Sequence, residues 1–537
     1  MIIRADYARF CALLFAASLL AGCSGGGSEE AADAGPDAPV ASVGAVTGFG
    51  SVFVNGVRFD TSRAVFDIDG RIGTQSDLDV GDRVVVKGAL ASDGRHGTAE
   101  RVEFDDNVEG PIAAIDAGAG TLLVLGQTVR VGPETSFDDS ITPRSLAGLS
   151  VGDVVEVSGL VASDGSITAS RIEKKPAGGE LEVTGIVASH DAVAKRFNIN
   201  ALVVDYSTAQ LEDFPSGAIA NGQRVEVKGR TINADVLVAT RVELKANDVA
   251  GAPGDRREVE GLVSRFVSAT DFDVAGVHVT TNAQTVFTGG TAADLALDIK
   301  VEVEGALDAA GVLVATKVAI RRASVVRIRA RVDSVDAAAG TFVVLGITVK
   351  VDELTRVEDE SSQRMRPFDL SNLNVGEFVE VRGGESPAGS GQVLAARLER
   401  EDGDDHEGDD EDECDSSGPG SGDDCEDDGE DECEDSSGPG SGDDCEDDGE
   451  DNRRDDDDGG EADGETVLQG FVQTVAEPAV TILGVTIETD NGTEFEDSND
   501  DSLTASAFFS VVGPGTLVKA EGAGVVQTVL QADEVEL

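Results

Sequence analysis

The chain has 537 residues, enough for several domains, and carries 104 acidic residues against 41 basic ones, which gives a formal net charge of −63. Nucleic-acid binding depends on Lys and Arg side chains that neutralise phosphates, so this charge excludes nucleic acid as a partner and also disfavours anionic lipid surfaces. Aromatic residues are only 4% of the chain and Trp is absent, so surfaces that stack on bases or sugars are poorly supplied.

The first 22 residues predict a lipoprotein signal peptide. Arg4 and Arg9 precede an apolar run from Phe10 to Leu20, which has the length of a signal h-region and is too short to span a bilayer. The run ends in Leu20-Ala-Gly-Cys23, which resembles the bacterial lipobox, where the Cys thiol receives a diacylglyceryl group. We therefore expect lipidation of Cys23 and a lipid anchor in the membrane. The alternative is an ordinary secretory signal followed by a chance Cys.

Residues 23–42 predict a flexible tether, because their Gly, Ser, Ala, Asp and Pro content cannot bury a core. Ser24, directly after the lipidated Cys, resembles the outer-membrane sorting pattern of cells with two membranes. The expected location is the cell envelope, lipid-anchored, at the outer membrane on its periplasmic face or at the cell surface.

One signature then recurs six times along the chain. It consists of a turn residue, an alternating Val strand and a Gly seven positions after the start, and successive copies begin 70 to 78 residues apart once a 65-residue acidic insertion is set aside. The copies span Gly81–Gly88, Gly152–Gly159, Gly222–Gly229, Asp298–Gly305, Gly376–Gly383 and Gly515–Gly522. Each copy closes with an Ala and an aliphatic residue three positions later, at Ala99, Ala169, Ala239, Ala315, Ala395 and Ala532.

The pattern within each copy predicts β-strands. Val and Ile alternate with polar residues at period two, and Asp93-Gly94 and Asp164-Gly165 favour tight hairpin turns. About five short strands in about 70 residues suit a small barrel, since closure removes exposed sheet edges. A continuous solenoid is the competing interpretation, although its usual repeat is shorter.

The predicted fold class is therefore all-β, with six tandem five-stranded OB-like barrels and one disordered acidic insertion. The expected domains are a signal peptide at 1–22, the tether at 23–42, repeats 1 to 6 at 43–107, 108–176, 180–246, 257–322, 325–400 and 466–537, and the acidic Cys-containing linker at 401–465.

Two segments give the repeats a family resemblance. Gly48-Phe-Gly-Ser-Val-Phe-Val-Asn-Gly-Val-Arg-Phe59 and Val108-Glu-Gly-Pro-Ile112, together with the signature, resemble the bacterial family called domain of unknown function 5666. The resemblance covers nearly all of residues 43–400 and 466–537, and repeats 3 and 6 match it least well. It implies the fold and secretion and supplies no site, because the family has no assigned activity.

Catalytic residues are not evident, and we expect a non-enzymatic protein without catalytic residues. His96, His190 and His406 are expected in a hairpin, a turn and the acidic insertion, and His278 is expected to point to solvent. A Thr followed two residues later by an aromatic or aliphatic residue recurs at Thr135, Thr285, Thr355 and Thr493. This element is interpreted as a strand start with one core residue rather than as a repeated site.

The acidic insertion, residues 401–465, carries −33 of the net charge and a tandem duplication with four cysteines. In an oxidising compartment these thiols should form disulfides, for which three connectivities exist. The Gly-Pro-Gly turn in each loop favours the local pairs Cys414–Cys425 and Cys433–Cys445.

The same insertion offers a calcium hypothesis. Gly429 and Gly449 stand at position six of two loops whose carboxylates have an EF-hand-like spacing. Glu at position 3 and Asp at position 12 depart from that pattern, so diffuse weak cation binding and a solvated spacer stay open as alternatives. The candidate ligands are Asp424, Glu426, Asp428 and Asp435 in the first loop and Asp444, Glu446, Asp448 and Asp455 in the second.

Two functions follow as expectations. The first is a cell-envelope lipoprotein whose repeated β modules serve a structural or adhesive role by binding a protein or an envelope polymer. The second is a protein that binds calcium or other divalent cations through residues 401–465. No further cofactor is expected.

Overall fold

The computed structural model describes residues 38–403 and 466–537, apart from short gaps at 50, 216, 234–235, 246–247, 322–323, 388, 498–500, 523–524 and 527. The predicted lipidation site Cys23 lies outside the described residues. So do His406, the four cysteines and the eight candidate calcium ligands of the acidic insertion. Within the described part, no helix has the length and apolarity needed to cross a membrane.

Repeat 2 shows how each unit is built. Its barrel strands are β8 (Val108–Asp116), β9 (Thr121–Val124), β10 (Gln127–Arg130), β12 (Val154–Val161) and β13 (Ile167–Lys175). The pairings run from β8 through β9, β10, β13 and β12 back to β8, so the sheet closes on itself, with β10 and β13 as the parallel pair. A closed barrel of five strands is OB-like, and the predicted fold class is confirmed.

The same closed circuit occurs in repeats 1, 4 and 5. Repeat 1 consists of β1 (Ala38–Gly48), β2 (Val52–Val54), β3 (Val57–Asp60), β4 (Val65–Ile68), β5 (Arg71–Gly73), β6 (Arg83–Leu90) and β7 (His96–Phe104). Repeat 4 consists of β21 (Arg256–Ser268), β22 (Asp271–Val274), β23 (Val277–Thr280), β24 (Val286–Thr288), β25 (Lys300–Leu307) and β26 (Leu313–Arg321). Repeat 5 consists of β27 (Val326–Asp336), β28 (Thr341–Val344), β29 (Ile347–Lys350), β30 (Arg356–Asp359), β31 (Phe378–Glu385) and β32 (Gln392–Glu401).

The predicted tether is too long by five residues. Residues 38–42 belong to β1 and pair with β6, from Ala38 opposite Leu90 to Ser42 opposite Val86. Their backbone groups are satisfied by the sheet, and this pairing outweighs the low β-propensity of the Ala-Pro composition.

In repeats 3 and 6 one barrel strand is broken. Repeat 3 has β14 (Leu181–Ile186), β15 (Ala188–Asp191), β16 (Arg196–Ile199), β17 (Leu202–Asp205), β18 (Gln210–Glu212), β19 (Arg224–Asn233) and β20 (Val236–Leu244), and its first strand is interrupted between β14 and β15. Repeat 6 has β33 (Thr466–Ala476), β34 (Ala479–Ile482), β35 (Val485–Glu488), β36 (Glu494–Glu496), α1 (Ala505–Val511), β37 (Leu517–Gly522), β38 (Val525–Val526), β39 (Val529–Gln531) and β40 (Glu534–Glu536), and its last strand is interrupted between β39 and β40. These are also the two copies whose sequences match the family resemblance least well.

The first residue of the signature closes one end of each barrel. Its amide N–H donates a hydrogen bond of 2.8 to 2.9 Å to a carbonyl of the first strand in all six repeats, as from Gly81 to Val46. The residue has a positive φ, from 62° at Asp298 to 97° at Gly152. Gly adopts this conformation without a steric penalty, which explains why five of the six copies have Gly there.

The last Gly of the signature faces the closing Ala on the neighbouring strand. In repeat 2, Gly159 lies opposite Ala169, where a β-bulge interrupts the register of β12 and β13. A Cβ on Gly159 would stand 2.4 Å from the carbonyl oxygen of Thr168. The two backbones therefore approach too closely for any side chain at this position.

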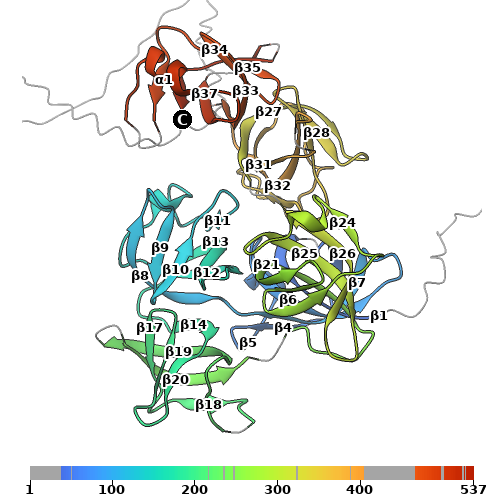
Figure 1. Ribbon diagram of the computed structural model, residues 1–537, viewed down its shortest axis with the longest axis vertical. Coiled ribbons are helices and arrows are strands. Elements are labelled where there is room, and N and C mark those ends of the chain that lie inside the picture. Colours follow the sequence, from blue (N-terminus) through green and yellow to red (C-terminus); the bar gives the residue numbers. More distant parts are fainter. Residues whose placement is uncertain are drawn as a thin grey trace, which may run out of the picture.

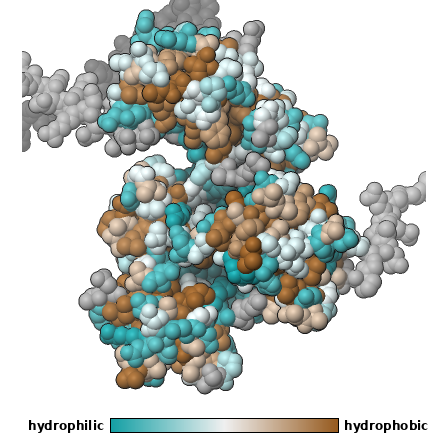
Figure 2. Space-filling view, viewed as in Figure 1, coloured by the Kyte–Doolittle hydropathy of each residue, from teal (hydrophilic) through white to brown (hydrophobic). Residues whose placement is uncertain are grey.

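The barrels join in pairs through their first strands. Strand β1 of repeat 1 pairs in parallel with β21 of repeat 4, whereas β8 pairs antiparallel with β14 and β27 pairs antiparallel with β33. The buried cores of repeats 2 and 3 are continuous, as are those of repeats 5 and 6. Figure 1 shows repeats 5 and 6, in yellow to red, above repeats 1 to 4. Hydrophilic and hydrophobic residues are interspersed over the face seen in Figure 2.

Candidate functional site

The four Thr elements are structural, and their interpretation as strand starts is confirmed. Each begins a short strand, among them β11 (Ser136–Phe137), that pairs in parallel with the last barrel strand. Each Thr hydroxyl donates to the carbonyl oxygen of the closing Ala at 2.7 to 2.9 Å. The pairs are Thr135 with Ala169, Thr285 with Ala315, Thr355 with Ala395, and Thr493 with Ala532.

The three described histidines lie in three different repeats. His96 is exposed in repeat 1, next to the carboxylate of Asp93 at 2.6 Å. His278 is exposed on β23, as predicted. The expected turn position of His190 is wrong, because it lies on β15, with its ring 2.6 Å from the hydroxyl of Tyr206.

A cavity opens where repeats 1, 2, 3 and 4 converge. Its volume is about 620 Å³, and its wall is mainly apolar. Asn107, in the link between repeats 1 and 2, holds three parts of this wall in place. Its N–H donates to the carbonyl of Val157 at 2.9 Å, its carbonyl accepts from Thr184 at 3.0 Å, and its Oδ1 accepts from the Gly159 amide at 2.7 Å. Apolar lining residues are Val43, Leu160, Ile167, Ile186, Leu262 and Val277.

The charged groups of the cavity wall are paired, with one exception. Arg224 forms an ion pair with Asp248 at 2.8 Å, and Lys245 forms one with Asp105 at 2.8 Å. The side chain of Arg83 forms neither a hydrogen bond nor an ion pair with any described residue. Burial, and then the neighbouring Arg224, lower the pKa of Arg83. Asp248 and Glu260 act on this guanidinium electrostatically, but no described carboxylate forms an ion pair with it, so it stays open to a ligand against an apolar wall.

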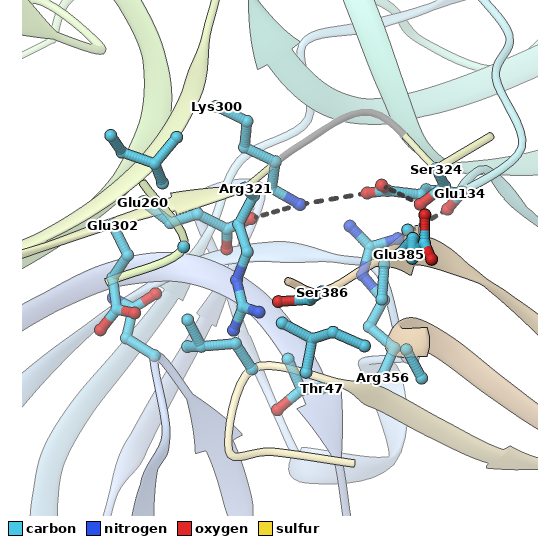
Figure 3. A pocket seen from close by; sticks show the side chains of 18 residues that line it. Thr47, Glu134, Glu260, Lys300, Glu302, Arg321, Ser324, Arg356, Glu385 and Ser386 are labelled. Carbon is cyan, nitrogen blue, oxygen red and sulfur yellow. Dashed lines mark hydrogen bonds and ion pairs between the residues drawn. The ribbon is translucent and has the colours of Figure 1, made fainter. Parts of the chain in front are cut away.

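A second pocket, shown in Figure 3, is lined by charged side chains, several of which pair with one another. Its volume is only about 60 Å³. Lys300 lies 2.9 Å from Glu260 and 3.3 Å from Glu134, and Ser324 donates to Glu134 at 2.7 Å. Burial alone would raise the pKa of Glu260, but Lys300 and Arg356 lower it to about 2. These groups satisfy one another where repeats 2, 4 and 5 meet, and the pocket is too small for an organic ligand.

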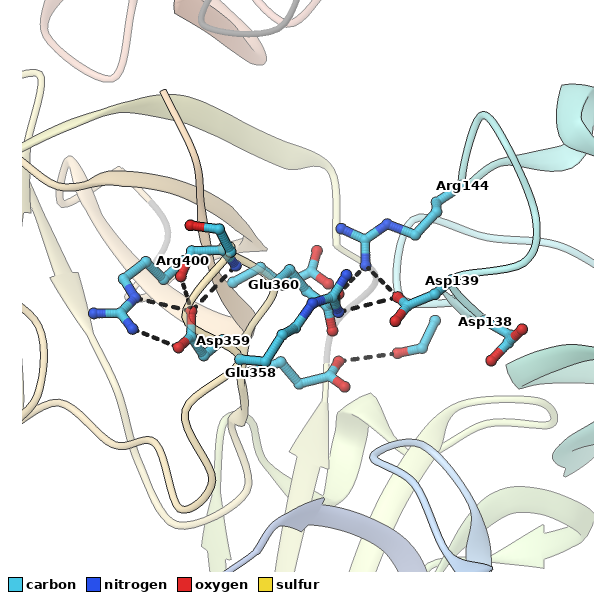
Figure 4. Close-up of polar contacts among 12 residues, drawn as sticks. Asp138, Asp139, Arg144, Glu358, Asp359, Glu360 and Arg400 are labelled. Atoms are coloured by element: carbon cyan, nitrogen blue, oxygen red, sulfur yellow. Dashed lines mark hydrogen bonds and ion pairs between the residues drawn. The ribbon is translucent and has the colours of Figure 1, made fainter. Parts of the chain in front are cut away.

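Repeat 5 has a cluster of three carboxylates whose negative charge is likewise balanced, here by arginine side chains. Carboxylate oxygens of Glu358, Glu360 and Glu399 lie within 4.8 Å of one another. Arg144 of repeat 2 pairs with Glu360, and Arg397 pairs with Glu399 and lies 3.7 Å from Glu358. Figure 4 shows how Arg144 approaches Glu358 and Glu360 across this joint. The cluster is an interface between two repeats, held by arginine.

In a third group of carboxylates, around Asp106, fewer positive side chains balance the negative charge. It comprises Asp69, Asp106, Glu109, Glu156 and Glu182, which come from repeats 1, 2 and 3 and from the link between the first two. Neither this group nor the cavity is evident in the sequence, because both form only when distant repeats pack together.

Six OB-like barrels, built on one signature and joined through their first strands, define an all-β repeat protein. The chain belongs to the family described as Domain of unknown function (DUF5666), whose model matches residues 39–103, 109–173, 184–243, 260–319, 329–399 and 469–536. The six matches confirm the resemblance inferred from the signature. No curated protein matches the chain. Among solved structures, one entitled "drosophila Unr CSD456" matches with 15% identity and a TM-score of 0.13, over 39% of this chain and 98% of that chain.

Proposed function

We propose that the protein is a non-enzymatic, lipid-anchored envelope protein whose barrels form a binding scaffold, and that the cavity among repeats 1 to 4 is its ligand site. One observation carries the proposal. Arg83 lines a mainly apolar cavity of about 620 Å³, and its guanidinium forms no hydrogen bond or ion pair with the described residues.

The size and the lining of the cavity indicate which class of ligand it binds. Ligand sites in proteins typically have volumes of about 300 to 1,000 Å³ and combine apolar walls with a few polar groups. An apolar wall favours an apolar body, and a buried guanidinium forms strong charge-assisted hydrogen bonds with a carboxylate or sulfonate. The ligand is therefore a small amphiphilic anion.

The roles of the repeated residues support a non-enzymatic function. The signature Gly, the closing Ala and the Thr hydroxyls all serve backbone geometry within a barrel, as at Gly159, Ala169 and Thr135. Catalysis needs acid, base or nucleophilic groups that converge in a cleft, and the described histidines are spread over three repeats.

A fluorescence titration tests the ligand site. The probe is 1-anilinonaphthalene-8-sulfonate, which combines an apolar body with one sulfonate, and the protein is the full mature chain. We expect Arg83→Gln to weaken binding at least tenfold. The matched control is Arg95→Gln, which removes the same charge from an exposed turn between β6 and β7 and should bind like the wild type. Equal affinity of Arg83→Gln and the wild type would contradict the proposal.

The lipid anchor and the envelope location rest on the lipobox at Leu20–Cys23 and the following Ser24. With anchoring, the scaffold would be held at the outer membrane, where it meets proteins or envelope polymers. Cys23→Ser should move the protein from the membrane fraction to the soluble fraction. If this variant stays in the membrane fraction, the proposal of a lipid anchor at Cys23 is contradicted.

Cation binding by the acidic insertion is the second candidate function, and its support is the spacing of carboxylates in residues 401–465. Isothermal titration of the full chain with and without this insertion measures it. Equal heats at millimolar calcium would end this candidate.

A further inference from the structure

A row of carboxylates crosses the joint between repeats 2 and 3. Glu156 on β12 lies directly opposite Glu109 on β8, and Glu109 lies directly opposite Glu182 on β14. The three strands are adjacent, so the three side chains share one face of the sheet. Like charges directly opposite one another on neighbouring strands are destabilising. This arrangement therefore calls for positive charge near the row.

Asp106 lies against the row and has no partner. It stands in the link between β7 and β8 and is only 1% exposed, and neither of its carboxylate oxygens has a hydrogen-bond partner among the described residues. A buried charge without a partner is costly. An Asp106 oxygen lies within 4.8 Å of oxygens of Glu109 and Glu156, and within 4.8 Å of oxygens of Asp69 and Glu182. Asp106 thus belongs to two triads of carboxylates at once.

The Asp106 carboxylate is not the only open acceptor in the group. Oε1 of Glu182, a residue that is 3% exposed, and Oδ1 of Asp69 are also buried without a partner. Asp69 lies in the turn between β4 and β5 with a φ of 51°, which brings its side chain to the link between repeats 1 and 2. Open acceptors from repeats 1 and 3 and from the link between repeats 1 and 2 therefore converge on one place.

The positive groups facing the cluster do not balance it. The ammonium of Lys175 lies 3.0 Å from Glu156, and that of Lys228 lies 2.5 Å from Glu182. Lys228 is shared with Glu226, and Lys245 contacts Glu226 and Asp105 outside the cluster. Two ammonium groups thus face five carboxylates: Asp69, Asp106, Glu109, Glu156 and Glu182.

Protons are the alternative source of compensation. Burial is the largest cause that raises the pKa of Glu156 to about 8 and that of Glu182 to about 9, and it raises the pKa of Asp106 well above its ordinary value. Neighbouring carboxylates add to the shift in each case. A cation that enters the cluster would displace protons and remove this repulsion.

We propose that Asp69, Asp106, Glu109, Glu156 and Glu182 bind one divalent cation, and that the ion is calcium. Carboxylate oxygens are the ligands that calcium prefers, at 2.3 to 2.6 Å and in numbers of six to eight. Two oxygens on opposite sides of such an ion are about 4.8 Å apart, and the oxygens of each triad all lie within 4.8 Å of one another, close enough to share one ion. Magnesium is less suitable, because it demands near-ideal octahedral geometry and dehydrates reluctantly.

The site goes beyond the proposed function, since it is separate from the ligand cavity and from the acidic insertion. Its ligands come from repeats 1, 2 and 3, so the ion cross-links these barrels. An ion that binds the folded state and not the unfolded chain stabilises the folded state, and the stabilisation grows with the logarithm of the ion concentration above the dissociation constant.

Equilibrium dialysis with radioactive calcium tests the site on the full mature chain, after chelator treatment and at about 0.1 M salt, where exposed charges are screened. We expect Asp106→Asn to lose one equivalent of tightly bound calcium relative to the wild type. The second variant, Glu182→Gln, should lose the same equivalent. The matched control Glu100→Gln removes a charge from an exposed position on β7 and should keep it. Equal stoichiometry in the wild type and both cluster variants would overturn the proposal.

Thermal unfolding separates a metal site from a merely structural role. Calcium should raise the melting temperature of the wild type but not that of Asp106→Asn. In the presence of chelator, Asp106→Asn should melt at or above the wild-type temperature, because it removes a buried carboxylate that has no partner. A wild-type melting temperature that calcium leaves unchanged would also overturn the proposal. Calcium retained by Asp106→Asn but lost on removal of residues 401–465 would place the binding in the insertion instead.

Discussion

The hydroxyl of Thr355 donates a 2.7 Å hydrogen bond to the carbonyl oxygen of Ala395, and both residues are buried. The same oxygen of Thr355 accepts a hydrogen bond from the amide of Asp352 at 3.0 Å. One side chain therefore fastens the loop after the third strand to the last strand of the barrel. Repeats 2, 4 and 6 have the equivalent contact, whereas Ala64 and Ala209 replace the Thr in repeats 1 and 3.

Thr355→Val should destabilise repeat 5 by about 1 to 3 kcal/mol, because it leaves a buried acceptor and a buried donor unsatisfied at nearly constant volume. Hydrogen exchange of the β32 amides measures this locally, which is appropriate for a chain of several domains. Thr348→Val on β29 is the control, and it should change stability by less than about 0.5 kcal/mol. Equal effects of the two substitutions would refute a special role for the Thr355 hydroxyl.

Gly159→Ala should be strongly destabilising. The added Cβ would stand 2.4 Å from the backbone oxygen of Thr168, and the strands must separate to accept it, at a cost of about 1 to 3 kcal/mol or more. Gly132→Ala is the control, because a Cβ there meets no atom within 4 Å. Urea denaturation of the full chain compares the two. Similar midpoints would show that β12 and β13 can separate freely.

The ion pair between Asp359 and Arg400 predicts a loss of stability in acid. Burial by itself raises the pKa of Asp359, but hydrogen bonds from Arg400 and Ser361 lower it to about 2, against 3.8 as the reference value. The folded state therefore binds the proton less tightly than the unfolded chain does. The stabilisation is complete above about pH 5 and is lost as the pH falls from about 5 towards 2, and it amounts to about 2 kcal/mol.

A double-mutant cycle of Asp359→Asn and Arg400→Gln, measured at several pH values, isolates this contribution. The coupling energy at pH 7 should be the part of the about 2 kcal/mol that Arg400 supplies, since hydrogen bonds from Ser361 and Met365 supply the rest, and it should shrink towards zero near pH 2. A coupling energy that is the same at both pH values would show that the pair does not titrate as described.

Much of the fold could be predicted from the sequence, because its signals are local. The Gly-to-Gly signature, the closing Ala and the alternating Val residues each specify a strand, a turn or a close approach within about 70 residues. The strand positions of the Thr elements and the exposure of His278 follow from the same pattern. The predictions that are wrong also concern local structure. Residues 38–42 are predicted in the tether but pair with β6, and His190 is predicted in a turn but lies on β15.

The candidate sites could not be predicted, because they depend on which repeats meet. Glu156, Glu226, Glu302 and Glu380 occupy the same signature position and point away from the Val core of their own barrels. Alternation alone places such residues in solvent, yet all four are buried. The pairing of repeat 1 with repeat 4 across two intervening repeats has no counterpart in the local pattern.

The most direct test of the scaffold and its ligand site is a crystal structure of the mature chain soaked with 12-bromododecanoate, in which the bromine is located by its anomalous signal. The account predicts that the carboxylate lies within about 3 Å of the Arg83 guanidinium, as in other charge-assisted pairs, with the bromine in the cavity among repeats 1 to 4. A bromine signal elsewhere on the barrels, or an empty cavity in crystals that hold the soaked ligand, would contradict it.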